Sequence, residues 1–101
     1  MNYVAYEIHE DESLGEIPIW YKKGILTLIP LKRGQLLDIT FNLCIESGLF
    51  NGQSATLLDR TPKGLVVQTN RGVCLIWRRY DDCLLEDDST TRMGAFDVRY
   101  G

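Results

Sequence analysis

The stretch ATLLDRTPKGLVVQTNRGVCLIWRRY, which runs from Ala55 to Tyr80, decides the fold. Three strand-like runs lie within it: Ala55–Asp59, Leu65–Thr69 and Val73–Tyr80. The TPKG link at residues 61–64 has the composition of a tight turn, because proline fixes φ at the second position and glycine accepts positive φ. The TNRG link at 69–72 is nearly as favourable. The stretch therefore predicts three consecutive antiparallel strands with short loops.

The last of these runs is apolar on both faces at its start. Its side chains alternate, with Val73, Leu75 and Trp77 on one face and Cys74, Ile76 and Tyr80 on the other. Because a strand at the middle of a sheet is covered on both faces, this pattern predicts a central strand.

A basic residue followed at once by glycine occurs four times in the chain, twice within this stretch and twice outside it, and indicates turns between strands. The four copies are Lys23-Gly24, Arg33-Gly34, Lys63-Gly64 and Arg71-Gly72. The other expected strands are Tyr3–Ile8, Ile17–Tyr21, Ile25–Ile29 and Ala95–Tyr100, and Pro30 is expected to end the third of them. In the last, Phe96, Val98 and Tyr100 share one face, opposite Asp97 and Arg99. That alternation predicts an edge strand with one wet face.

The segment Gln35–Ser47 fits two interpretations. As a strand, its odd positions from Leu37 to Ile45 line one face. As a helix, apolar residues fall at spacings of three and four, and Gly48 supplies a left-handed cap. The β-branched residues at 39 and 40 favour the strand, but the spacing and the cap together favour the helix slightly.

Length and composition indicate one soluble domain spanning residues 1–101, with acidic loops at about 9–16 and 81–91. The net charge is −3, and no apolar run approaches the ~20 residues of a membrane helix. The number of cysteines is odd, and Cys44, Cys74 and Cys83 all have apolar neighbours. This predicts reduced thiols and a cytoplasmic location. A disulfide between Cys74 and Cys83 is the alternative.

The expected fold class is β-rich, either all-β or α+β with one helix at about 35–47. A twisted antiparallel sheet curled into a small barrel or roll suits the strand lengths. In strand length and turn spacing, residues 55–80 resemble the central sheet of SH3-like barrels. The resemblance covers about a quarter of the chain and concerns the fold alone, since small barrels carry many unrelated functions.

No catalytic or metal-ligating constellation is visible in the sequence. His9 is the only histidine and lies in an acidic segment, without the positioned partners that a general base needs. Cys83 follows two acids and lacks the neighbouring cation or base that activates a thiolate, which disfavours nucleophilic chemistry there. The acidic clusters lack the alternating ligands and glycine of calcium loops. We therefore expect a protein that is not an enzyme and has no metal or cofactor.

The candidate binding residues gather between residues 57 and 80, where five cations accompany one acid. The set is Arg60, Lys63, Arg71, Trp77, Arg78, Arg79 and Tyr80. Because charge is segregated along the chain, the first hypothesis is a small regulatory or accessory module that binds another protein. The alternative is a small β-barrel that binds nucleic acid with this basic and aromatic surface. The sequence identifies neither the partner nor the oligomeric state.

Overall fold

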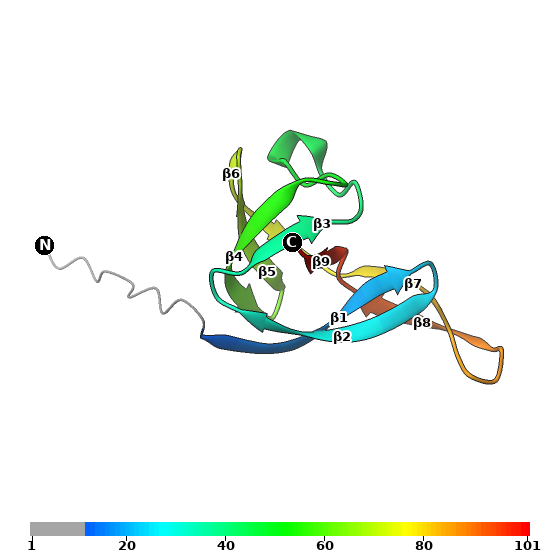
Figure 1. The fold of residues 1–101 in the computed structure, drawn as a ribbon. Helices are drawn as coiled ribbons and strands as arrows, with labels where there is room; N and C mark the ends of the chain where they lie inside the picture. Colours follow the sequence, from blue (N-terminus) through cyan, green and yellow to red (C-terminus); the bar gives the residue numbers. More distant parts are fainter. Residues whose placement is uncertain (1–11) are drawn as a thin grey trace, which may run out of the picture.

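The computed structural model describes residues 12–101, in which short strands form three antiparallel sheets (Figure 1). The strands are β1 (Ser13–Lys22), β2 (Ile25–Lys32), β3 (Leu36–Ile39), β4 (Ser54–Thr61), β5 (Gly64–Thr69), β6 (Gly72–Ile76), β7 (Arg79–Leu84), β8 (Thr90–Ala95) and β9 (Val98–Tyr100). One 3-10 turn, η1 (Ile45–Ser47), lies between β3 and β4. The predicted β-rich class is confirmed, whereas residues 12–101 form no closed barrel.

The largest sheet has the order β6-β5-β4-β3-β9 and contains the meander predicted from residues 55–80. Two-residue turns join β4 to β5 and β5 to β6, as the TPKG and TNRG sequences predict. The glycines at 24, 34, 64 and 72 all adopt positive φ. At Gly64 the close approach of β6 adds a second requirement, since a Cβ there would collide with the Ile76 carbonyl oxygen. Turn chemistry thus determines the order of β4, β5 and β6 within this sheet.

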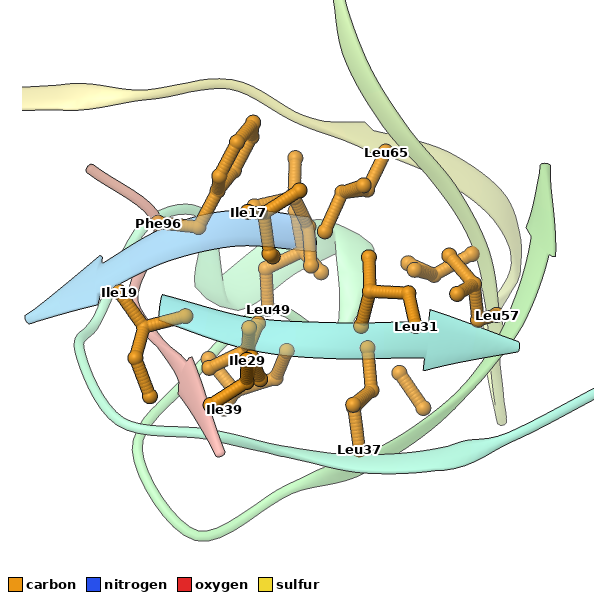
Figure 2. Close-up of a cluster of buried hydrophobic side chains, with 14 residues drawn as sticks. Ile17, Ile19, Ile29, Leu31, Leu37, Ile39, Leu49, Leu57, Leu65 and Phe96 are labelled. Carbon is orange, nitrogen blue, oxygen red and sulfur yellow. The ribbon is translucent and has the colours of Figure 1, made fainter. Parts of the chain in front are cut away.

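The β1–β2 hairpin covers one face of the five-stranded sheet and then continues beyond it (Figure 1). Figure 2 shows the resulting core, in which Ile17 of β1 and Leu31 of β2 are drawn with Leu57 and Leu65 of the sheet. All four side chains are fully buried. Packing of hydrophobic side chains between these layers is the main source of stability in this fold.

The far half of the β1–β2 hairpin packs on the third sheet, β7–β8. Trp20, Cys83 and Ala95 form a small buried cluster there, with Leu26 at its border. Backbone hydrogen bonds tie the parts together, because Trp20 N–H donates to the Phe96 carbonyl and Phe96 N–H donates to the Pro18 carbonyl. The β1–β2 hairpin therefore packs against both the five-stranded sheet and the β7–β8 sheet.

The prediction that Val73–Tyr80 is one central strand was wrong. The strand ends at Ile76, and a new strand, β7, begins at Arg79 and pairs with β8 rather than with β5. The predicted alternation within β6 holds, since Cys74 and Ile76 pack against the core while Val73 is exposed. However, β6 is the edge of its sheet. Apolar residues on both faces here mark an exposed edge and not a covered strand.

The helix expected at Gln35–Ser47 is also absent from the structure. Leu36–Ile39 forms β3 instead, and it pairs with β4 on one side and β9 on the other. Two ladders of backbone hydrogen bonds and burial of Leu37 and Ile39 outweigh the helical spacing. The cap survives on a smaller scale, because Gly48 is left-handed (φ 84°) and its N–H bonds to the Ile45 carbonyl of η1.

Strand boundaries differ from the predictions in three places. Pro30 does not end β2, which continues to Lys32 as a strand paired only with β1, where a missing N–H is tolerated. The acidic segments 13–16 and 81–84 belong to β1 and β7, so the connection near 81–91 shrinks to residues 85–89. The predicted strand Tyr3–Ile8 and the acidic segment 9–11 lie outside the described residues.

The wet face predicted for Asp97 was wrong. The chain bends between β8 and β9, and the Asp97 side chain turns inward and is 1% exposed. The residues that follow, Val98–Tyr100, form the edge strand β9 as expected. Cys44, Cys74 and Cys83 are all unpaired thiols, so the alternative disulfide is not formed. Within residues 12–101, no helix is long and apolar enough to cross a membrane.

Candidate functional site

The outer edge of β6 is the first surface that the fold leaves open. Within residues 12–101 its backbone pairs only with β5. Its sequence, Gly-Val-Cys-Leu-Ile, contains no charged residue and no proline. Natural proteins usually protect such edges with lysine, proline or a bulge, because unpaired N–H and C=O groups recruit further strands. An apolar and unprotected edge is therefore a candidate binding element.

Cations lie near both ends of β6. Arg71 is in the turn that leads directly into the strand. At the other end, the β4–β5 turn carries Lys63, and Gly64 next to it lies against Ile76 and Trp77. Arg78 follows Trp77, whose side chain is 53% exposed. None of these three cations forms an ion pair with another residue in the described part of the chain.

Gly64, next to Lys63, thus approaches Trp77 at one end of β6, and Arg71 lies at the other end. The Arg78 guanidinium lies over the buried Phe96 ring, 5.2 Å from its centroid. The remaining predicted residues have other positions. Arg60, at the end of β4, donates from its Nη1 to the Leu14 carbonyl (2.9 Å) and so fixes the start of β1. Tyr80 lies on β7 with its ring directly over Gly94 of β8. These contacts give Arg60 and Tyr80 a structural role that requires no ligand.

Arg79 forms the best-defined polar cluster in the structure. Its Nε and Nη2 both donate to the Asp97 carboxylate, at 3.0 and 2.9 Å, and its Nη1 donates to Asp81 Oδ2 at 3.2 Å. The guanidinium lies over the Phe41 ring, 4.3 Å from its centroid, and near the Trp20 ring at 5.5 Å. Trp20 Nε1–H in turn donates to the Arg79 carbonyl at 2.9 Å. This network joins β1, β7 and the β8–β9 bend.

The titration behaviour follows from these bonds. The hydrogen bonds that Arg79 donates to the Asp97 carboxylate raise the pKa of the arginine above its usual value. The pKa of Asp81 is lowered, mainly because its carboxylate accepts the Asp82 N–H (2.8 Å), with Arg79 contributing further. Both groups are therefore charged at neutral pH. Arg79, predicted as a binding residue, already has all of its charge matched within the protein.

An open pocket of about 640 Å³ lies beside this network. It is formed where the β1–β2 turn, the segment after β3 and the start of β7 meet. Four of its lining side chains are cations and two are carboxylates: Lys22, Lys23, Arg79 and Arg99, with Asp81 and Asp97. Exposed aromatic rings of Tyr21 and Phe41 complete the walls.

The sulfur atoms of two cysteines contact the same serine, Ser47. Cys44 Sγ contacts Ser47 Oγ at 3.3 Å, and Cys74 Sγ lies 3.9 Å from the Ser47 carbonyl oxygen. The Ser47 hydroxyl lowers the pKa of Cys44, whereas burial raises the pKa of Cys74. Across residues 12–101, no group of three or more potential metal ligands is gathered.

Sequence reasoning missed Asp97, Trp20 and Phe41 as members of a polar and aromatic cluster. The burial of Asp97 was not predicted, because the alternation of residues 95–100 assigns Asp97 to the solvent side. Its burial depends on a partner 18 residues away, and local patterns carry no signal of that distance. Comparison with known proteins finds no matching family model, no matching curated protein and no matching solved structure.

Proposed function

We propose that this protein is a non-enzymatic module that binds another protein by strand addition at β6. The supporting observation is the edge itself, whose five residues are apolar, unprotected and, within 12–101, unpaired on one side. Strand addition gains affinity from main-chain hydrogen bonds and specificity from alternate side chains. Exposed Val73, which is 64% accessible, and half-buried Leu75 would provide the apolar contacts on the outer face.

The charges around β6 indicate the chemistry of the partner strand. Arg71 at one end and Lys63 with Arg78 at the other give a positive rim, and none of the three forms an ion pair in the described residues. A second copy of β6 would bring these like charges together, which is unfavourable. The favoured occupant is therefore an extended partner segment with alternating apolar residues and acids at its two ends.

A synthetic peptide tests this proposal directly. The probe alternates valine and threonine and carries glutamates at both ends. Binding is followed by amide NMR shifts and by hydrogen exchange, and β6 amides are expected to gain protection. The matched probe is the same peptide N-methylated at alternate residues, which keeps the charge but cannot continue the ladder. Equal binding of the two probes, or protection elsewhere than β6, would contradict strand addition.

Charge reversal tests the positive rim. Arg71→Glu combined with Arg78→Glu should weaken peptide binding about tenfold, since each exposed charge pair contributes up to ~1 kcal/mol. Arg92→Glu on β8 is the control matched to Arg71→Glu alone, because Arg92 is exposed and lies outside the five-stranded sheet. Arg79 is unsuitable for this test, since its substitution would disturb the Asp97 network. Equal losses in the control would assign the effect to net charge alone.

Nucleic-acid binding is the second candidate, and the exposure of Trp77 beside Lys63 and Arg78 favours it. Proteins that bind single-stranded nucleic acid combine stacking aromatic rings with cations. This function requires a steep loss of oligonucleotide affinity with salt and a strong effect of Trp77→Ala. Neither effect is expected for strand addition.

Two further properties belong to this proposal. The short strands and tight turns of β4–β6 support a relationship in architecture to the central sheet of SH3-like barrels. The three unpaired cysteines support a reducing, cytoplasmic location.

A further inference from the structure

The pocket at the junction of the hairpins is a separate feature that strand addition at β6 does not use. Its lining comes from β1, the β1–β2 turn, β7 and β9, and from residues that follow β3. None of β6 contributes to it. Its volume of about 640 Å³ falls in the range of small-molecule sites. The question is which ligand chemistry its walls favour.

The carboxylates of the pocket both form ion pairs within the protein, whereas its two lysines form none within residues 12–101. Both lining carboxylates, Asp81 and Asp97, already bind the Arg79 guanidinium. Of the other cations, Lys22 and Lys23 form no ion pair within residues 12–101. Arg99 has only a long contact with Asp38, at 3.8 Å, and is 69% exposed on its side chain. Four lining cations against two carboxylates leave the pocket with net positive charge, although Lys23 is close enough to Asp81 to help lower the pKa of that carboxyl.

Aromatic rings stand beside these cations. Tyr21 is 63% exposed and Phe41 is 44% exposed, although both line the pocket. The Phe41 ring is held against the Arg79 guanidinium, which is itself fixed by Asp97, so the ring has a rigid support. Lys22 lies over the Tyr21 ring, 5.4 Å from its centroid. A planar ligand group can stack on such rings at modest cost.

We infer that this pocket binds a ligand that combines a phosphate with a planar ring, as a nucleotide does. Lys22, Lys23 and Arg99 receive the phosphate, and Tyr21 or Phe41 stacks on the base. The ligand is either a free mononucleotide or one nucleotide of a single strand, since both present the same chemistry. Binding involves no covalent step, and it is independent of the proposed strand addition.

The intrinsic fluorescence of Trp20 provides the first test, because Trp20 lines the pocket and Trp77 does not. In a Trp77→Phe variant, only Trp20 reports. Titration with AMP should change its emission at submillimolar to millimolar concentrations, and a short oligothymidylate should do so if the source is a single strand. Inorganic phosphate and adenosine alone should each bind at least fivefold more weakly. Equal binding of phosphate and AMP would overturn the stacking half of the inference.

Variants locate the site. Lys22→Gln with Lys23→Gln should weaken AMP binding roughly tenfold, since each exposed charge contributes up to about fivefold. Lys32→Gln with Arg92→Gln removes the same charge at two exposed residues outside the pocket lining and should leave AMP affinity unchanged. Amide NMR shifts in the K22Q/K23Q protein report whether it is folded. Absence of any AMP binding by the wild type, or equal losses in both double variants, would overturn the inference.

Discussion

At the residue scale, Asp97 has the largest structural consequence. Its carboxylate is buried and accepts hydrogen bonds from both Nε and Nη2 of Arg79, so an amide in its place would leave the guanidinium partly unmatched. Asp97→Asn should lower the free energy of unfolding by about 2 kcal/mol, below the cost for a fully buried pair, because Arg79 is 28% exposed. Urea denaturation measures this. Asp81→Asn, at a more exposed partner, should cost less, and a larger loss there would contradict the assignment.

Asp81 also makes a prediction about pH. Its pKa is lowered from the ordinary value of 3.8, which means that folding favours its charged form. Its contribution to stability is therefore present above pH 3.8 and is lost as pH falls through the lower folded pKa. Wild-type and Asp81→Asn proteins should differ in melting temperature at pH 6 and converge near pH 2. A constant difference across this range would show that the titration of Asp81 does not affect stability.

At the element scale, β7 and β8 are registered by the contact of Tyr80 with Gly94. A Cβ on Gly94 would come within 2.5 Å of the Tyr80 ring, so Gly94→Ala must displace that ring. We expect a loss of about 1–2 kcal/mol, typical of overpacking. In a Tyr80→Ala background the same change should cost little, because the ring is gone. A double-mutant cycle of thermal or urea unfolding measures this coupling, and additive effects would contradict it.

The elements also show how far the sequence predicts this fold. Turns with glycine at 64 and 72 depend on residues adjacent in the chain, and they were predicted correctly. The strand break after Ile76 was missed, because it results from β7 pairing with β8 and from the distant bond between Arg79 and Asp97. The same distance explains the candidate site. The positions of the residues around β6 can be predicted from the adjacent turns. The pocket cannot be predicted in this way, because its lining comes from segments that meet only after folding.

At the scale of the described structure, stability is expected to be uneven. The main core contains fully buried side chains from both hairpin strands and the five-stranded sheet, whereas the cluster under β7–β8 has three buried residues. Amides of β4 and β5 should therefore exchange most slowly with solvent, and those near residues 85–89 most rapidly. Native-state hydrogen exchange followed by NMR measures this order. Equal protection of β8 and β5 would mean that the two parts open together.

The contact between Ile19 and Phe96 has a consequence for the time at which the protein can fold. It joins a residue near the start of the described chain to one near its end. During synthesis, β1 and β2 can form a hairpin early, but its far half finds its partners only when residues beyond 90 have left the ribosome. Until then, the apolar face of that far half remains incompletely covered. Such long-range closure predicts refolding on the order of milliseconds to seconds rather than microseconds.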